Sequence, residues 1–288
     1  MKSYRIPQLA TNYASYDMIT KHTELPHLSD TRVHLLYIFL NECSAAKEQA
    51  ELYSLAASLV QLGLDTHAQV SEASGENGEV NMRSLQLKVL AGDYFSGLFY
   101  EMLAKQGEIE MISAMSREIC EINVLKMNLY SRIKDSALSA EQYLSLTVQL
   151  NMQLFLSFTP LFDEPLQKAW KLLLRALTTC EILLQELQDD RQHTPDVFSF
   201  SYWHVYNAAS LQEKSLLQSM NVKDWKELCH KYKGTNQLMD KLVTAVHEAE
   251  SAINSYALIG DTRLSSVKSL LKPYVDFINA AGCAVREG

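Results

Sequence analysis

The chain has 288 residues, of which 47% are hydrophobic and 21% are charged, a balance typical of a globular protein rather than a disordered or membranous one. Its formal net charge of −8 at pH 7 argues against a general nucleic-acid binder, so we expect no nucleic-acid partner. Only 10 Gly and 6 Pro interrupt it, which favours helix nearly everywhere.

Residues 1–28 form either an N-terminal extension or a first helix. Beyond them, apolar side chains recur every three or four positions, which is the period of a helix with one buried face. The segment 82–104 carries two adjacent apolar stripes, one of which runs through Phe95, Phe99 and Leu103. Helices are also predicted around 35–39 and 52–60 and over 108–133, 140–158, 165–189, 208–220, 222–232, 235–257 and 263–281.

Two stretches rich in turn-forming residues interrupt the helices. They are SEASGENGEV at 71–80 and QDDRQHTPDVFSFSYWH at 188–204, where Pro195 stops the preceding helix. Neither looks like a domain linker, and the chain has no internal repeat and no long run of alternating polarity. The sequence therefore predicts one all-α domain over 1–288, with ten or more helices.

Residues 142–162 carry no charge and are the window to test for a membrane span. The window contains Asn151 and several glutamines and hydroxyls, and Pro160 ends it, so a buried helix is favoured. The start, MKSYRIPQLATNYASYD, has no apolar core of signal-peptide length. The five cysteines are far apart and form no CxxC pair, which indicates free thiols in a reducing compartment. We therefore expect a cytoplasmic protein without a transmembrane segment.

The segment KVLAGDYFSGLFY places an aspartate between small and aromatic residues. With the upstream LVQLGLDTHAQV, it resembles the trans-prenyl diphosphate synthases, in which a helix ends in DDxxD and the next opens with AVLAGDYLL. Downstream, YLSLTVQLNMQLF stands where that family has a Lys-Thr-Ala segment, and LLQELQDDRQH stands where it has its second DDxxD. The resemblance covers roughly residues 30–190. It implies antiparallel helices around a central cavity, with the two aspartate-rich positions on facing helices.

Within that superfamily, LDTHAQV followed by VLAGDYFSGL looks like component 1, the small non-catalytic subunit, of the bacterial heterodimeric heptaprenyl diphosphate synthases. The resemblance implies a catalytic partner subunit that carries both complete motifs and the magnesium ions. It also implies a prenyl diphosphate chain held in the complex and a role in making the menaquinone side chain.

The first aspartate-rich position of this chain lacks most of the ligands that the chemistry requires. Joining an allylic diphosphate to isopentenyl diphosphate releases diphosphate as an anion, which magnesium ions held by carboxylate oxygens must neutralise. DDxxD supplies those oxygens because carboxylates at i and i+4 share one helical face. Here only Asp65 is acidic, since Thr66 and Gln69 occupy the i+1 and i+4 places, and His67 is a poor magnesium ligand.

The second position is also incomplete. Asp189 and Asp190 survive, but His193 replaces the last carboxylate and Glu186 stands where the family usually has Gln. The Lys-Thr-Ala segment has become Leu-Asn-Met at 150–152, and the loop after the first motif offers glutamates instead of paired arginines. We therefore expect this chain to have no catalytic residues and to bind no metal or cofactor of its own, magnesium being bound by the partner.

The surviving residues of both motifs also have simpler structural interpretations. Asp65 with His67 is either a metal pair or a helix-end aspartate next to an exposed histidine. The second cluster, Asp189, Asp190 and His193, either holds one ion weakly or is a solvated helix C-terminus before Pro195.

Asp93 lies on its helix with Gly97 and Tyr100, off the apolar stripes. In the resembled family this Asp-Tyr pair is scaffold, so we expect a structural role for Gly92, Asp93 and Tyr94. Asp93 would hydrogen-bond either a neighbouring helix or its own first turn, and Gly92 and Gly97 would permit close helix approach at a cost in helix propensity.

Three further groups of residues are candidates for contacts inside the complex. The small residues that could make room for a prenyl chain are Ala56, Ala57 and Gly63. The candidates for the partner interface are Phe95, Phe99 and Leu103. The third group is an aromatic cluster, predicted to pack in the core and alternatively to face a partner or a prenyl chain: Phe198, Phe200, Tyr202, Trp203 and Tyr206.

The leading hypothesis is a non-catalytic subunit of a heteromeric long-chain prenyl diphosphate synthase, needed for the partner's activity and for product length. One alternative is an active synthase with an atypical single-metal site built from Asp65, Asp189 and Asp190. The other is a helical interaction or lipid-binding protein that has left isoprenoid synthesis.

Overall fold

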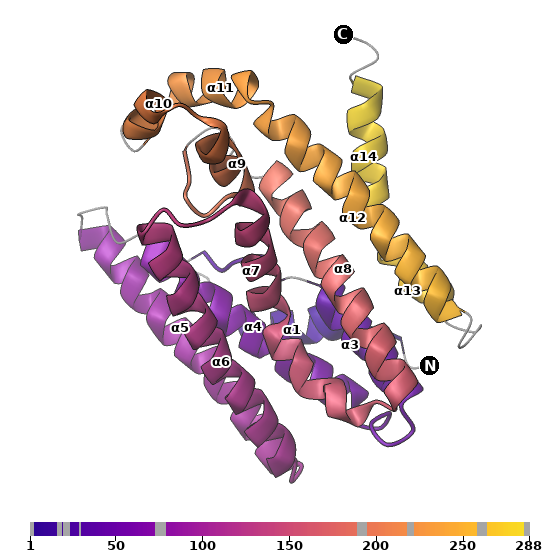
Figure 1. Ribbon diagram of the computed structural model, residues 1–288. Helices are drawn as coiled ribbons and strands as arrows, with labels where there is room; N and C mark the ends of the chain where they lie inside the picture. The colour runs from indigo at the N-terminus through magenta and orange to yellow at the C-terminus, as the bar shows by residue number, and fades with distance from the viewer. Residues whose placement is uncertain are drawn as a thin grey trace. The chain divides into compact units, whose positions relative to one another are not determined.

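The computed structural model describes residues 3–15, 19, 24–28, 30–72, 79–188, 195–217, 222–257 and 264–284 (Figure 1). All regular secondary structure in these ranges is helical, so the all-α prediction is confirmed. The helices are α1 (Ile6–Ala14), α3 (Thr31–Glu42), α4 (Ala50–Glu72), α5 (Glu79–Lys105), α6 (Ile109–Lys134), α7 (Ala140–Met152), the 3-10 helix η1 (Gln153–Leu161), α8 (Glu164–Gln188), α9 (Phe200–Ala208), α10 (Leu211–Leu216), α11 (Val222–Lys231), α12 (Gly234–Ala257), α13 (Leu264–Ser269) and α14 (Lys272–Ala284).

Helices α6, α8, α11 and α12 agree with their predicted bounds to within one residue, and three other predicted helices are each divided. The helix expected over 140–158 ends at Met152 and is followed by η1. Near this end, the side-chain amide of Asn151 donates a 2.9 Å hydrogen bond to the carbonyl oxygen of Thr147. The helix expected over 208–220 is divided at Ser210, which caps a new helix. The helix expected over 263–281 is interrupted before Pro273, which has no N–H to continue it.

The window at 142–162 is a helix followed by a 3-10 segment with several buried side chains, among them Tyr143, Leu144 and Phe155. Across the described ranges, no helix has an apolar stretch long enough to cross a membrane. Four cysteines are free thiols, as predicted, and Cys283 lies outside the described side chains.

The chain divides into two compact units. Unit 1 takes its described residues from Met1–Ile119 and Leu154–Gln167, and unit 2 takes its own from Cys120–Gln153 and Lys168–Gly288. Each unit has its own buried apolar residues. The single domain over 1–288 stays a prediction.

In unit 1, α4 and α5 pack against each other as an antiparallel hairpin (Figure 1). Later residues of α4 meet earlier residues of α5: Gly63 lies against Ser96, and His67 lies against Gly92. Helix α3 also packs against α4, and nine of its twelve residues are buried. This hairpin contains both the first aspartate-rich position and the AGDY segment, so it positions the candidate site.

In unit 2, the aromatic cluster around α9 is mainly core. Phe200, Tyr202 and Trp203 are buried together with Trp225 of α11, whereas Phe198 is at the surface. The packing interpretation is therefore confirmed for the three buried members. Glu186 of α8 caps α9, because its carboxylate accepts 2.8 Å hydrogen bonds from the backbone N–H groups of Phe200 and Ser201 and from the Ser201 hydroxyl.

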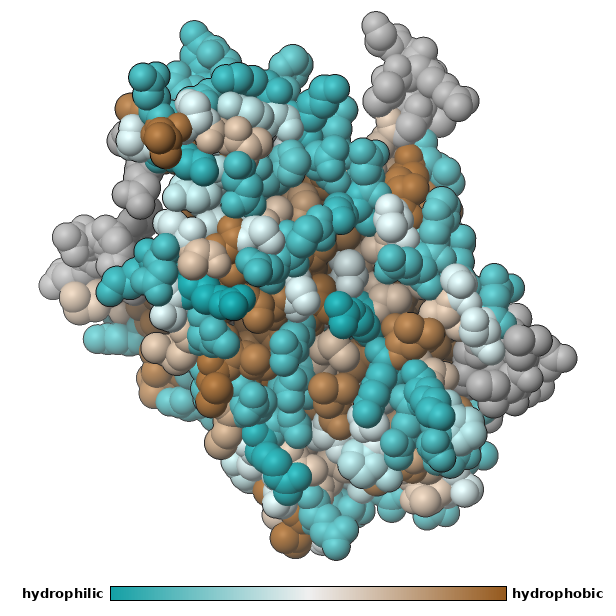
Figure 2. Space-filling model, viewed as in Figure 1, coloured by the Kyte–Doolittle hydropathy of each residue, from teal (hydrophilic) through white to brown (hydrophobic). Residues whose placement is uncertain are grey.

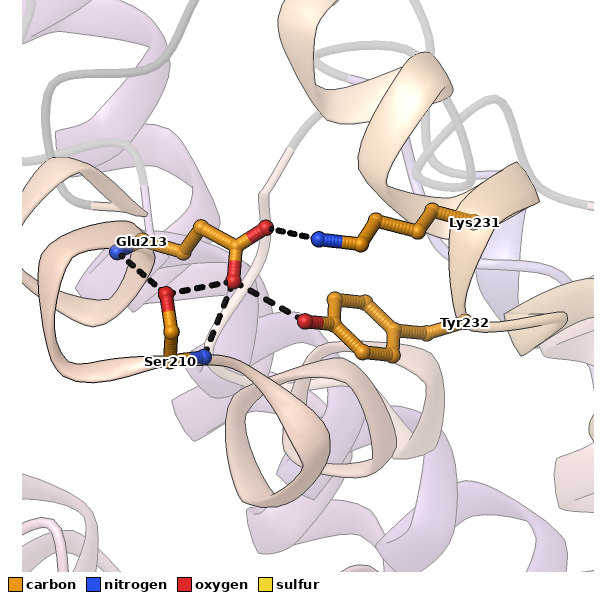
Figure 3. Close-up of polar contacts among 4 residues, drawn as sticks. All are labelled: Ser210, Glu213, Lys231 and Tyr232. Carbon is orange, nitrogen blue, oxygen red and sulfur yellow. Dashed lines mark hydrogen bonds and ion pairs between the residues drawn. The ribbon is translucent and has the colours of Figure 1, made fainter.

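Helices α10 and α11 are joined by a carboxylate that accepts four hydrogen bonds (Figure 3). Glu213 accepts from Lys231 at 2.7 Å, from the Ser210 N–H at 2.9 Å, from the Ser210 hydroxyl at 2.7 Å and from the Tyr232 hydroxyl at 2.9 Å. The hydrogen bond from Lys231, followed by those from Ser210, lowers the pKa of Glu213 to about 2. The network therefore favours the ionised carboxylate.

Acidification should weaken this connection between α10 and α11. Because the pKa of Glu213 is lowered on folding from 4.5 to about 2, its contribution is complete above pH 4.5 and is lost as the pH falls towards 2. In urea titrations, the Glu213→Gln variant should lose less stability than the wild type between pH 5 and pH 2.5. The matched control is Glu227→Gln, which removes an exposed carboxylate of α11. Equal losses in wild type and Glu213→Gln would contradict the assignment.

Candidate functional site

The carboxylate of Asp65 already has a protein partner. The side-chain amide of Gln61, one turn earlier on α4, donates a 2.7 Å hydrogen bond to Asp65 Oδ1. The oxygen of the same amide accepts a longer contact, 3.4 Å, from the Nη1 of Arg32 on α3. Gln61 thus connects two side chains, Arg32 of α3 and Asp65 of the first aspartate-rich position.

Sequence reasoning missed Arg32 and Gln61. Arg32 is only 5% exposed, and its guanidinium carbon lies 5.4 Å from the centre of the Phe155 ring, a cation–π distance. The signal that could have revealed it is its position in RVHLLYIFL, a single strong cation at the start of an apolar helix. A buried cation needs compensating partners, and such a group would be expected beside an acidic or amide side chain.

His67 and Asp93 join α4 to α5. The imidazole Nε2 lies 3.4 Å from Asp93 Oδ1, and the ring lies against Gly92, where an added Cβ would be only 2.5 Å from Nε2. Gly92 therefore leaves the space that the His67 ring fills. Asp93, whose side chain is 67% exposed, reaches the neighbouring helix through this histidine.

These donors do not fit a magnesium–diphosphate site. Asp65 offers one carboxylate, which already accepts a hydrogen bond from Gln61, and His67 faces Asp93. Among the residues that the structure describes, no group of three or more His, Cys, Asp or Glu side chains is placed to hold a metal ion. The second cluster, Asp189, Asp190 and His193, lies outside those residues. Its separation from Asp65 therefore stays a prediction.

The three small residues predicted to make room for a prenyl chain have different surroundings. Ala56 and Ala57 are fully buried on α4, and their role stays a prediction. At Gly63, an added Cβ would be 2.9 Å from Ser96 Oγ and 3.1 Å from the carbonyl oxygen of Gly92. The space beside Gly63 is therefore filled by α5, and we correct its assignment from the chain tunnel to close packing of α4 against α5.

Gly63→Ala should destabilise unit 1, because the new methyl group would lie too close to Ser96 Oγ and to the Gly92 carbonyl oxygen of α5. Forcing a methyl group into a well-packed contact costs about 1–3 kcal/mol. The matched control is Gly97→Ala on α5, where nothing lies within 4 Å of an added Cβ and the helix gains up to about 1 kcal/mol. Urea unfolding of the two variants measures both. A Gly63→Ala chain as stable as the wild type would contradict the close-packing role.

The candidate interface residues Phe95, Phe99 and Leu103 require a correction. All three are fully buried within the chain, since their side of α5 packs on its own core. A second chain cannot contact side chains that are already covered. The opposite side of α5 is exposed, and its large hydrophobic side chains are Met82, Val89, Leu90, Tyr94 and Tyr100.

We call this exposed side of α5 the α5 outer stripe. On the face of the molecule drawn in Figure 2, hydrophobic residues are interspersed with hydrophilic ones. Leu90 is 63% exposed and Met82 is 62% exposed, unusually high values for large apolar residues. The stripe is the strongest candidate for a protein interface in unit 1.

A family model described as heptaprenyl diphosphate synthase (HEPPP synthase) subunit 1 matches residues 16–237, most of the chain. The chain belongs to this family. The resemblance found in LDTHAQV and VLAGDYFSGL is therefore confirmed. Heptaprenyl diphosphate synthase component 1 of Geobacillus stearothermophilus is 40% identical over 93 residues, which are 32% of this chain and 40% of that protein. The match spans well under two thirds of that relative's length.

Solved structures support the fold of this subunit 1 family member. A polyprenyl synthase from Caulobacter crescentus CB15 superimposes with a TM-score of 0.67 at 15% identity, covering 95% of this chain and 92% of that one. Heptaprenyl diphosphate synthase from Staphylococcus aureus gives 0.65 at 13% identity, covering 92% and 95%. At these identities the likeness establishes the fold alone.

Proposed function

We propose that this chain is the non-catalytic subunit of a heteromeric, heptaprenyl-type trans-prenyl diphosphate synthase. The observation that carries the proposal is the state of the first aspartate-rich position, where a single carboxylate is bound to Gln61 although the surrounding α4–α5 hairpin is intact. A chain of this family that lacks the ligands for diphosphate departure needs another subunit to provide them.

The catalytic partner would supply both complete aspartate-rich motifs and the magnesium ions. This chain would complete the dimer, support the partner's activity and help to set the length of the product. The product would be the long prenyl diphosphate that becomes the menaquinone side chain, made in the cytoplasm. The name of the Geobacillus relative, a component 1, supports a second component in this system as well.

The partner would bind the α5 outer stripe. Leu90 and Tyr94 face outward at the centre of a 27-residue helix whose opposite side is held by α4. A helix with apolar residues on two sides is typical of one that packs on its own core and on a second chain. Obligate interfaces of this kind bury more than about 2,000 Å² in total, so other elements would contribute to the contact.

The isolated chain should bind magnesium and a diphosphate analogue weakly or not at all. Magnesium requires several hard oxygen ligands, and the first motif offers one carboxylate. Isothermal titration calorimetry of the chain with a non-hydrolysable prenyl diphosphate and magnesium tests this. In the complete complex, Asp65→Ala should change turnover by less than about tenfold, or about 1.4 kcal/mol of barrier.

The control is the equivalent alanine substitution in the partner's intact first motif, which should abolish turnover. Micromolar, magnesium-dependent diphosphate binding by the isolated chain would favour an active enzyme instead. So would a loss of several orders of magnitude for Asp65→Ala in a complex that still assembles.

A further inference from the structure

Arg32 is a buried cation at the beginning of α3, a place that is unfavourable for positive charge. It is 5% exposed and is the second residue of the helix. No acidic side chain lies in the first turn, and the carboxylate of the N-cap residue Asp30 accepts a hydrogen bond from the Tyr4 hydroxyl. The amino end of a helix carries a partial positive charge, which repels a cation, and burial adds a further cost. Arg32 therefore needs compensating partners on other elements.

Gln61 connects this cation to the surviving carboxylate of the first motif. The guanidinium donates to Gln61 Oε1 at 3.4 Å, and Gln61 Nε2 donates to Asp65 Oδ1 at 2.7 Å. Only one orientation of the amide serves both neighbours, because a guanidinium has no acceptor and an ionised carboxylate has no donor. The Phe155 ring, whose centre is 5.4 Å from the guanidinium carbon, adds a cation–π contact.

We propose that Arg32 is an internal cation that takes the place of a metal ion at the first aspartate-rich position, and that it keeps divalent metals away from Asp65. The proposal goes beyond the missing carboxylates, because it assigns the exclusion of metal to a residue outside the motif. It does not depend on the proposed function, since it concerns unit 1 of the isolated chain alone.

Two features of this arrangement oppose a divalent cation. The N–H of Gln61 is directed at Asp65 Oδ1, so it occupies that oxygen and presents the positive end of its dipole to an incoming metal. The guanidinium behind the amide carries a full positive charge, and its burial limits screening by water and salt. Restoring a carboxylate to the motif would therefore not restore metal binding while Arg32 is present.

The first test restores a carboxylate with and without Arg32. Gln69→Asp places a second carboxylate four residues after Asp65, on the same helical face. Mn²⁺, which accepts the same oxygen ligands as Mg²⁺, is titrated into the isolated chain and its free concentration is measured by electron paramagnetic resonance. Gln69→Asp alone should bind within threefold of the wild type. Gln69→Asp with Arg32→Met should bind at least tenfold tighter than Gln69→Asp.

The matched control is Gln69→Asp with Lys47→Met, which removes an exposed positive charge of unit 1 instead. This variant should bind Mn²⁺ as Gln69→Asp does, because an exposed charge is screened. Equal affinities of the two double variants in folded chains overturn the proposal, and so does a Gln69→Asp chain that binds at least tenfold tighter than the wild type.

The second test measures the coupling of the two charges and needs no metal. In urea titrations, Asp65→Asn should lower the ratio of folded to unfolded chain at least fivefold in the wild type but less than twofold in an Arg32→Met background. If Arg32→Met does not fold, Gln61→Met takes its place, since it removes the connecting amide and keeps both charges. In that background the loss should be less than threefold. An equal loss from Asp65→Asn in the wild type and in the variant background overturns the connection.

Discussion

The isolated chain is expected to form no prenyl diphosphate from farnesyl and isopentenyl diphosphates. The first motif of this chain has one carboxylate, which is already hydrogen-bonded to Gln61, so it offers too few oxygen ligands for the magnesium ions that neutralise the departing diphosphate. Mixing the chain with a homologue that has two intact DDxxD motifs should restore long-chain synthesis. The expected difference is at least about ten-thousand-fold, or about 5.4 kcal/mol of barrier.

The measurement is incorporation of radiolabelled isopentenyl diphosphate, followed by separation of the products by chain length. The homologue alone is the essential control, because it should make little product or shorter product. A second control mixes the homologue with heat-denatured chain. It tests whether a contaminant, and not the folded chain, restores synthesis. Elongation by the isolated chain, or full rate and full product length from the homologue alone, would contradict the subunit hypothesis.

A charge on the α5 outer stripe should abolish the activity of the complex without unfolding the chain. Leu90 is 63% exposed, so Leu90→Glu should change the free energy of unfolding by no more than about 0.5 kcal/mol. In a complex, the same carboxylate would be buried against apolar side chains, at a cost of several kcal/mol. Association and activity should therefore be lost together, as seen by gel filtration and by the elongation assay.

Phe99→Glu is the instructive comparison. Phe99 is fully buried, so a carboxylate there would disrupt the core and cost more than about 4 kcal/mol, a large part of a typical domain's stability of about 5–15 kcal/mol. Loss of activity in Phe99→Glu would report unfolding, whereas loss in Leu90→Glu would report the interface. A Leu90→Glu chain that still assembles and supports full turnover would rule out the α5 outer stripe as the partner surface.

Much of the secondary structure follows from local sequence signals. Four helices were placed to within one residue because their apolar period and their end signals agree. The three divided helices show where local signals compete, because Ser210 can begin a helix and Pro273 cannot continue one. The family was recognisable from LDTHAQV and VLAGDYFSGL because a short, specific motif survives even where the metal ligands are lost.

The sequence by itself determined that this chain is helical, that it belongs to the subunit 1 family and that its first motif keeps only one carboxylate. Only the tertiary structure decided which side of α5 is covered. Both sides carry aromatic and aliphatic residues, and it is the packing of α4 that buries Phe95 and leaves Leu90 exposed. The same holds for Arg32 and Gln61, which are 29 positions apart and meet only because α3 packs on α4. Periodicity within a helix identifies its apolar faces, but the neighbouring helix selects the one that becomes core.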